Sequence, residues 1–213
     1  MVEVRDVAPG LWLWRQGYPD WQQGRHSLER LGWGPEVASF AYAGGGGVVL
    51  VDALAPPDDA REFWERLERE PPRALVVMKP DHVRSVDLFV ERYGVPAYGP
   101  DVFHRSDVPA TELEWIGPGA ELPGGASALY DGRGRNETPL HLTEQRALLF
   151  ADALTAPHGE LLVWGTPWHE ERVLPALRAL LELDFEHVLV SHGQPVHDRA
   201  EFERALERAP WEA

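Results

Sequence analysis

The order of apolar and polar residues along the chain predicts strands and helices in alternation. Apolar runs rich in aromatic and β-branched residues predict strands at 10–15, 36–43 and 48–53. Four glycines at 44–47 separate the last two strands and supply the positive φ angles that a hairpin turn needs. A phosphate-binding loop would need a helix directly after the glycines, whereas a strand is predicted there. We therefore interpret this part of the chain as a β-hairpin.

A strand–helix–strand unit is predicted next. Residues 56–70 begin with proline and aspartate and place apolar residues at helical spacing, which predicts a helix. Residues 74–78 form a short apolar run typical of a buried strand. Asp81 stands where the N-cap of a helix over 82–94 is expected, and 95–99 returns as a strand. Two strands joined by one helix indicate a parallel pair with a crossover connection.

The second half of the chain repeats this mixture. Two short strands are predicted within the proline- and glycine-rich stretch 101–135, and a further strand at 147–153. An amphipathic helix over 166–184, a strand over 187–193 and a terminal helix over 198–209 complete the pattern. Hairpins in each half with crossovers between them indicate two sheets flanked by helices rather than one doubly wound sheet.

Composition narrows the class of protein. The 213 residues are 44% apolar and 26% charged, without a linker or a break in composition, so we expect a single soluble domain over 1–213. The absence of cysteine excludes disulfides, thiolate nucleophiles and cysteine-ligated zinc. The formal net charge of −15 disfavours nucleic acid as a partner. No signal peptide and no membrane-length apolar segment are recognisable, so we expect a cytoplasmic protein without a membrane partner.

One basic residue stands apart from the others. Lys79 is the sole lysine among twenty basic residues, and it lies in the segment VVMKPDHVRSV at 76–86. The same segment contains an aspartate and a histidine directly after a predicted strand. The simplest interpretation of a lysine is a solvated and idle side chain. The position of this one inside a cluster of polar residues favours a functional role.

Four segments place polar side chains at the ends of predicted strands, which is where an α/β scaffold presents its site residues. These segments are KPDH at 79–82, NETPLH at 136–141, ADAL at 151–154 and SHG at 191–193. Two of these histidines and the three carboxylates would form a metal site rich in nitrogen and oxygen. Zinc, iron and manganese all accept this ligand set.

The ordered set of segments resembles the metallo-β-lactamase-fold superfamily over nearly the whole chain. VVLVDA resembles the family's strand ending in aspartate, and VVMKPDHVRSV stands in the place of the His-x-His-x-Asp-His motif. ELPGG, NETPLH, FADAL and VLVSHG follow in the family's order. The resemblance implies an α/β fold, a four-layer αββα sandwich of two mixed sheets flanked by helices. It also implies two metals between the sheets that activate a hydroxide for hydrolysis.

The residues depart from the family at one of the two metal positions. The three histidines that hold the first metal fall on Val77, Lys79 and Glu137, so the resemblance implies that this site is lost. The ligands of the second metal are kept, and they are Asp81, His82, His192 and the bridging Asp152. His141 matches a family histidine that is usually not a direct ligand.

The lost metal suggests a role for the lysine. Removing a dication from a site full of carboxylates leaves uncompensated negative charge, which is costly when buried. Lys79 would place an ammonium where the first metal would lie, paired with Glu137 and Asp152. Simpler interpretations remain open: Asp81 only caps its helix, and His82 and His192 are ordinary polar residues at the edge of a cleft.

Two functions of different classes follow. The first is a hydrolase of an ester, thioester or lactone with at most one divalent metal (zinc, iron or manganese), in which Asp152 or Glu137 accepts a proton and Lys79 polarises the carbonyl. The second is a non-catalytic binding or scaffold protein, without a metal, that kept the fold and binds a small ligand. In both cases the expected partner is a small molecule. The sequence does not choose between them, and it does not give the substrate or the oligomeric state.

The remaining histidines and the tryptophans are given simple interpretations. His104, His158, His169 and His197 lack paired spacing and are predicted to lie at the surface. The nine tryptophans are expected to fill the core and the walls of the cleft.

Overall fold

Two β-sheets pack face to face in the computed structural model, which describes residues 2–24, 29, 32–103, 107–130 and 137–211. The seven strands of the first sheet lie side by side in the order of the chain. They are β1 (Glu3–Ala8), β2 (Leu11–Gly17), β3 (Glu36–Ala43), β4 (Val48–Val51), β5 (Pro72–Val76), β6 (Ala97–Gly99) and β7 (Glu114–Trp115). The first four pair antiparallel and the last four pair parallel, so this sheet is mixed.

The second sheet has four strands in the order β13, β10, β9, β8. Their bounds are β8 (Ala126–Ala128), β9 (Leu140–Leu142), β10 (Ala147–Phe150) and β13 (His187–Val190). Strands β8, β9 and β10 pair antiparallel, whereas β10 and β13 are parallel. A separate two-stranded ribbon joins β11 (Leu154–Thr155) to β12 (Leu162–Val163).

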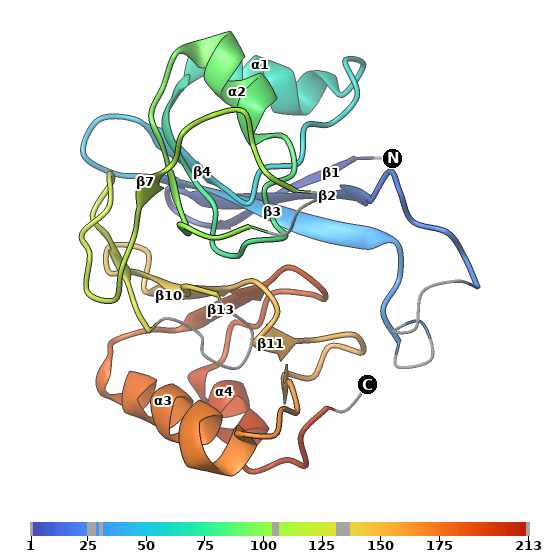
Figure 1. Ribbon diagram of the computed structural model, residues 1–213, viewed down its shortest axis with the longest axis vertical. Helices are drawn as coiled ribbons and strands as arrows, with labels where there is room; N and C mark the ends of the chain where they lie inside the picture. The colour runs from blue at the N-terminus through green and yellow to red at the C-terminus, as the bar shows by residue number, and fades with distance from the viewer. Residues whose placement is uncertain (1, 25–28, 30–31, 104–106, 131–136, 212–213) are drawn as a thin grey trace.

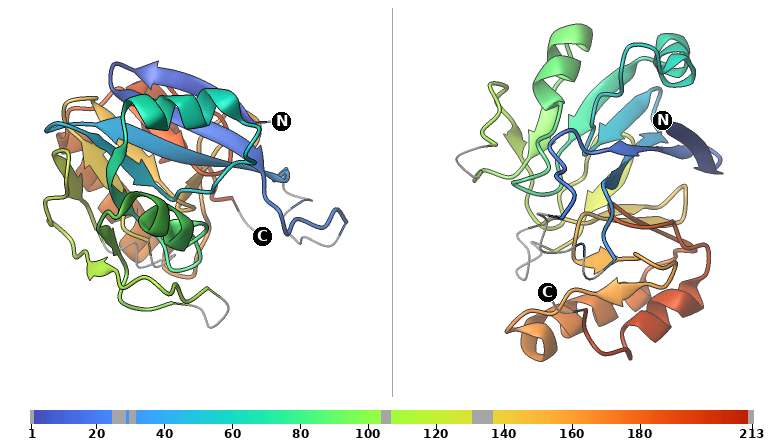
Figure 2. Two further views of the ribbon diagram at one scale, coloured as in Figure 1. Left: turned by 90° about the horizontal axis from the view of Figure 1, so that it is seen from above. Right: turned by 90° about the vertical axis from the view of Figure 1, so that its right-hand side faces the viewer.

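Helices cover the outer face of each sheet (Figures 1 and 2). On the first sheet they are α1 (Arg61–Arg69) and α2 (Val86–Tyr93). On the second they are α3 (Leu174–Ala179) and α4 (Arg199–Ala205). A π-helical turn at His169–Val173 precedes α3 and a 3₁₀ turn at Leu180–Glu182 follows it, so the helix predicted over 166–184 is divided into three parts.

Three apolar clusters account for the layers. Alternation along β2 sends Leu11 and Leu13 into the cluster between the two sheets, while Trp12 and Trp14 face α1 and α2. A third cluster lies between the second sheet and its helices. The central strands of each sheet are therefore buried on both faces, which explains why they appear as continuous apolar runs in the sequence. The predicted four-layer αββα sandwich of two mixed sheets is confirmed.

The first turn of the second helix differs from the prediction. Asp81 was expected to cap a helix over 82–94, but α2 begins at Val86 with Ser85 in the N-cap position. Residues 79–85 instead form a turn in which Arg84 adopts a positive φ of 50°. The turn lets this segment present polar side chains to the space between the sheets rather than continue as a helix.

Some elements lacked a recognisable pattern. Strand β1 is half-exposed and contains charged residues, and β11 and β12 are two residues long. Such short or polar strands form only because a neighbouring strand pairs with them.

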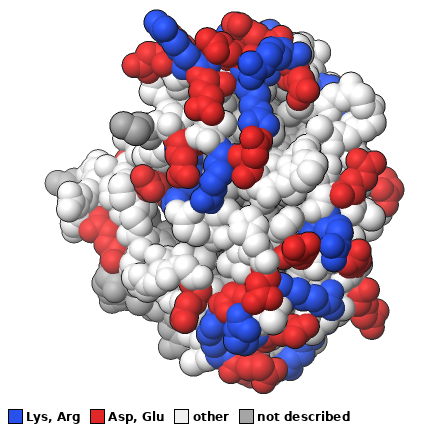
Figure 3. Space-filling view, turned by 180° about the vertical axis from the view of Figure 1, so that it is seen from behind, with Lys and Arg blue, Asp and Glu red and all other residues white. Residues whose placement is uncertain are grey.

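Within the described residues no helix combines the length and the apolar character needed to cross a membrane. On the face shown in Figure 3, basic side chains are interspersed with acidic ones rather than gathered in a stripe.

Candidate metal centre

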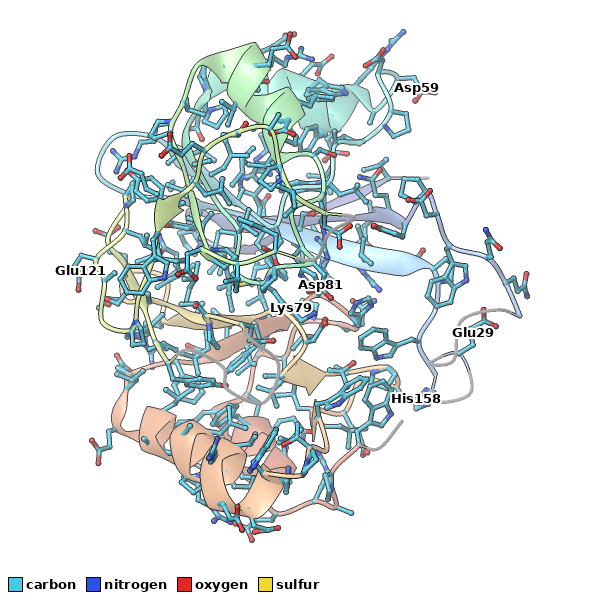
Figure 4. The ribbon with its side chains drawn as sticks, in the orientation of Figure 1. Glu29, Asp59, Lys79, Asp81, Glu121 and His158 are labelled. Carbon is cyan, nitrogen blue, oxygen red and sulfur yellow. The ribbon has the colours of Figure 1, made fainter. Side chains whose placement is uncertain are left out.

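The candidate site lies where two pairs of parallel strands end. Strands β4 and β5 align Val51 with Val76, and β10 and β13 align Phe150 with Val190. The carboxyl ends of parallel strands meet at one edge of a sheet. The loops that follow these four strands carry Asp52, Lys79 to His82, Asp152 and His192 into the same space, and Figure 4 shows Lys79 and Asp81 between the two halves of the fold.

Lys79 forms ion pairs inside this space. The residue is only 5% exposed, and its Nζ lies 3.1 Å from Oδ2 of Asp152 and pairs with Oδ1 of Asp81. The interpretation of Lys79 as a solvated side chain is therefore wrong. The expected pairing with Asp152 is present, whereas Glu137 directs an oxygen to backbone amides instead.

His82 is oriented by a carboxylate that the sequence analysis did not assign to the site. Its Nδ1 lies 2.7 Å from Oδ2 of Asp52, and the other oxygen of Asp52 accepts a hydrogen bond of 2.8 Å from the backbone N–H of Met78. With Nδ1 donating to Asp52, Nε2 faces Asp152 at 3.5 Å from Oδ1. Burial opposes a charge on this imidazole, but Asp152 and Asp52 outweigh it and raise the pKa of His82 to about 9.

His192 approaches Asp152 from the second sheet. Its Nε2 lies 3.6 Å from Oδ1 of Asp152, and its ring stacks on Trp33 with centroids 3.6 Å apart and planes at 12°. Trp33 is itself held by a hydrogen bond of 2.9 Å from Nε1 to the Thr155 hydroxyl. Burial outweighs the attraction of Asp152 and lowers the pKa of His192 to about 3, so this imidazole is neutral and keeps its lone pair for a ligand.

The two carboxylates of the second sheet play different parts. Burial favours the neutral form of Asp152, but His82 and Lys79 outweigh it and hold its pKa well below the usual range. Glu137 is fully buried, and its Oε2 accepts hydrogen bonds of 2.7 Å from the backbone N–H groups of both Asp152 and Ala153. Burial and the charge of Asp152 raise the pKa of Glu137 to about 7. Glu137 thus fixes the turn that carries Asp152.

Asp81 is more open to water than its neighbours. Its side chain is 38% exposed and is drawn to the Lys79 ammonium. Burial raises the pKa of this carboxyl, but Lys79 outweighs burial and the pKa is lowered. Among the described residues, the group whose ligand atoms lie within 4.8 Å of one another consists of His82, Asp152 and His192, without Asp81. The structure thus brings three of the four predicted ligands together and turns the fourth to the lysine.

The three converging residues fit one divalent cation. Their nitrogens lie 3.5 and 3.6 Å from the same oxygen of Asp152. Bonds of about 2.1 Å from each atom to one common ion would be long enough to span these distances. The carboxylate behind His82 adds the hydrogen bond that metal-binding imidazoles usually make through their other nitrogen.

The position of the family's first metal does not fit a cation. Val77 has no ligand atom, and it packs in the apolar cluster under α1 and α2. Lys79 brings an ammonium into the same space, and an ammonium has no lone pair to donate. Of the Glu137 carboxylate, Oε2 is committed to two backbone amides, and Oε1 is a single buried oxygen without a second ligand beside it at Val77 or Lys79. No step can be assigned to a metal at this position.

Two supporting residues were not assigned to the site from the sequence. Asp52 ends a strand with a polar side chain, the same feature that singled out the four other segments, and could have been added on that ground. Arg84 lies in the turn after His82, and its guanidinium donates hydrogen bonds of 2.7 Å to the backbone carbonyls of both Ala38 and Asp52. An isolated arginine in a loop offers no sequence signal for this role.

The other histidines lie apart from the site. His141 faces the backbone carbonyl of Asp184 at 3.1 Å. His158 and His197 are exposed as predicted, but His169 is 7% exposed, so its prediction as a surface residue is wrong. The π-helical turn at the start of the α3 region packs this side chain inward. His104 and Asn136, the first residue of the third segment, lie outside the described residues.

Comparisons with known proteins agree with this fold. The family model described as the metallo-beta-lactamase superfamily matches residues 31–192. The fold is similar to the metallo-beta-lactamase FIM-1 from Pseudomonas aeruginosa in its mono-zinc form, with a TM-score of 0.70, 16% identity and coverage of 97% of this chain and 95% of that chain. A metallo-beta-lactamase from Pontibacter korlensis also gives a TM-score of 0.70, at 15% identity over 98% of this chain and 100% of that one.

A third similar structure is the metallo beta lactamase from Hirschia baltica, with a TM-score of 0.65, 16% identity and coverage of 97% and 96%. Identities this low show the fold alone. No curated protein matches the sequence. The family model covers most of the chain and includes the four strand ends that carry the site. The chain belongs to the metallo-beta-lactamase superfamily.

Proposed function

We propose that the protein is a hydrolase of a small ester, thioester or lactone that uses one divalent cation, with the Lys79 ammonium in place of the family's first metal. The observation that carries this proposal is the convergence of His82, Asp152 and His192 around one point, with Lys79 3.1 Å from the same Asp152. Zinc, iron and manganese suit this ligand set.

The number of ligands supports a catalytic rather than a structural role. Structural zinc sites are closed by four protein ligands, whereas catalytic sites keep three and leave a position for water or substrate. A divalent cation in such a site supplies Lewis acidity toward water and carbonyl oxygen. The similar FIM-1 structure is described as a mono-zinc form, so this fold can hold a single zinc.

The chain's own residues orient the ligands. Asp52 fixes the tautomer of His82 by accepting from Nδ1, which directs Nε2 to the site. Trp33 fixes the plane of the His192 ring by stacking on it. Glu137 holds the backbone of Asp152 in place, so we assign it a positioning role rather than that of a proton acceptor. Ligands held in this way keep their positions when a cation binds, and His82 would then release from Nε2 the proton that its raised pKa retains there.

Lys79 supplies the positive charge that the family's first metal would otherwise provide. Its ammonium has three donors, and Asp81 and Asp152 accept from them. Because Asp81 is 38% exposed, its carboxylate can turn to water and free a donor for the developing negative charge on a carbonyl oxygen. The proton of the attacking water passes to Asp152, or to Asp81 once its carboxylate has turned from Lys79 to the water.

The test measures metal content and turnover together. We expect about one equivalent of zinc, iron or manganese per chain after purification without chelator, and hydrolysis of at least one member of an ester, thioester and lactone panel. His192→Gln should lose both, because glutamine is a poor ligand of similar polarity. The matched control is His197→Gln at an exposed histidine, which should lose neither. Binding of two metals per chain, or unchanged metal content in the His192 variant, would refute the proposal.

One observation favours the second candidate function, a non-catalytic binding protein. The Lys79 ammonium already pairs with both Asp81 and Asp152 and cancels one of their two negative charges, so the carboxylates depend less on a dication for compensation. A protein that takes up no metal and shows no turnover on the whole panel, but keeps its fold, would support this function over the hydrolase.

A further inference from the structure

A cavity of about 370 Å³ lies directly beside His192. It is open between the end of β2, the segment leading into β3 and the loop after β13, and its described walls include Arg15, Trp33, Glu36, Pro157, His192 and Gly193. Its volume is at the lower end of the range for small-molecule sites. His192 therefore has two neighbours, the candidate metal centre and this cavity.

Strand geometry explains how an arginine reaches this place. Along β2 the odd-numbered residues Leu11 and Leu13 point into the space between the sheets, so Arg15 points the same way. Arg15 pairs across the strands with Ala38, whose backbone N–H donates a hydrogen bond of 2.9 Å to the carbonyl of Ser191, next to His192. The two sheets thus touch here, at the end of the apolar layer, and the cation faces the gap.

Arg15 is buried with little compensation. The residue is 8% exposed, and its Nε has no hydrogen-bond partner among the described residues. Its ion pair runs from Nη2 to Oε2 of Glu36 at 3.4 Å, and that carboxylate is itself 60% exposed. An ion pair with so exposed a partner contributes little, whereas a buried charge without full pairing is costly. A second anion in the cavity would supply the missing interaction.

The walls define the chemistry of that anion. A guanidinium fork matches a carboxylate with two parallel hydrogen bonds. Trp33, Pro35 and Pro157 present ring surfaces that suit an apolar body. Glu36 stands at the same guanidinium and would repel a dianion more strongly than a monoanion. In a chain of net charge −15, a ligand of this kind needs a local cation to be drawn in.

We propose that this cavity is a binding site for a small organic monocarboxylate, held by Arg15 in competition with Glu36. The site does not depend on the proposed hydrolase activity, because its cation belongs to the chain. If the hydrolase is also correct, the cavity would hold the carboxylate end of a substrate while its other end reaches the centre beyond His192. Failure of one proposal leaves the other open to its own test.

Calorimetric titration of the full-length protein with benzoate tests the proposal, with benzamide as the neutral analogue. We expect benzoate to bind and benzamide to bind at least tenfold more weakly. Arg15→Gln should weaken benzoate binding at least tenfold, and Glu36→Gln should tighten it several-fold because the competing carboxylate is gone. The matched control, Glu3→Gln on exposed β1, should leave the affinity unchanged.

Several results would overturn the site. The proposal is refuted if benzoate binds neither the parent nor the Glu36 variant. It is also refuted if Arg15→Gln leaves the benzoate affinity unchanged, which would indicate binding at the metal centre. Inorganic phosphate that binds as tightly as benzoate overturns the choice of a monocarboxylate. If Arg15→Gln fails to fold, the Glu36 variant decides, since an exposed side chain can be changed without loss of structure. An affinity equal to that of the parent would then refute the proposal.

Discussion

Lys79 shows how one side chain can take over part of the role of an ion. Its ammonium lies between Asp81 and Asp152, in the space where the resemblance to the family places a metal-binding histidine. A metal ion can be lost from a site, but a lysine is covalently part of the fold and cannot exchange. The cation is therefore permanent, and the carboxylates around it stay charged whether or not a dication binds at His82, Asp152 and His192.

Replacing this cation should destabilise the protein. Lys79→Met keeps most of the side-chain volume but leaves Asp152, which is 3% exposed, with one cation fewer. Breaking a buried pair costs about 3–5 kcal/mol of unfolding free energy, and we expect about 3 kcal/mol because His82 still faces the carboxylate. Urea unfolding at pH 7 measures the change.

The control for this prediction is Arg178→Met. Arg178 lies 3.8 Å from Glu207, and both side chains are largely in water, so the loss should not exceed about 1 kcal/mol. If Lys79→Met unfolds at the same urea concentration as the parent, the lysine contributes nothing to the charge balance of the site.

At the scale of elements, charged side chains also join segments that are distant in sequence. Glu201 on α4 accepts hydrogen bonds from Arg208, Arg204 and the backbone N–H of Leu161, just before β12. These contacts hold the terminal helix against the two-stranded ribbon. Alternation and helical spacing predicted α4 as an element, but they gave no information about which distant residues it would contact.

Glu201 should make this junction sensitive to acid. The hydrogen bond from Arg208, helped by Arg204 and Leu161, lowers the pKa of Glu201 to about 2 in the folded protein. Because the folded pKa lies below the unfolded value, the stabilisation is complete above about pH 4.5 and is lost as the pH falls toward 2. Glu201→Gln should therefore lower stability at pH 6, and the difference from the parent should shrink by pH 3.

Urea midpoints at the two pH values measure this difference. Glu203→Gln on the same helix is the matched control, since its side chain is 53% exposed and its pair with Arg199 spans 3.4 Å. That variant should follow the parent at both pH values. A Glu201 variant with a constant deficit from pH 6 to pH 3 would contradict the proposed linkage.

For the whole molecule, the apolar layer between the sheets is the structure that the two halves share. It draws residues from β2 to β5 of the first sheet and from β8 to β10 and β13 of the second. Since neither sheet can bury that face alone, we expect the chain to unfold as one unit, which would test the prediction of a single domain.

Truncating a residue at this layer should weaken both sheets together. Leu189→Ala, at a fully buried position on β13, should lower the unfolding free energy by about 2–5 kcal/mol. The unfolding transition followed by loss of helix and the one followed by loss of tryptophan packing should shift to the same extent. Leu88→Ala on α2 is the control, because Leu88 is 45% exposed and should change stability by less than about 0.5 kcal/mol. Two separate transitions in the parent would show that the halves fold independently.

The sequence by itself determined most of the strands and helices, and its resemblance to the superfamily implied the order of the layers. Apolar runs that end in polar residues, such as 147–153 and 187–193, are recognisable locally because strands buried on both faces need apolar side chains at every position. The resemblance to the superfamily identified the strand ends that carry Lys79, His82, Asp152 and His192, since their order along the chain is preserved.

Only the tertiary structure decided which of these side chains meet. Asp81 was expected to bind metal and instead turns to Lys79, and Glu137 was expected to face the lysine and instead binds two backbone amides. Asp52, Trp33 and Arg15 acquire their roles from residues far along the chain. Hydrogen bonds and ion pairs require the distance between atoms on separate strands to be right to within a few tenths of an ångström, and no local pattern of residues encodes those distances.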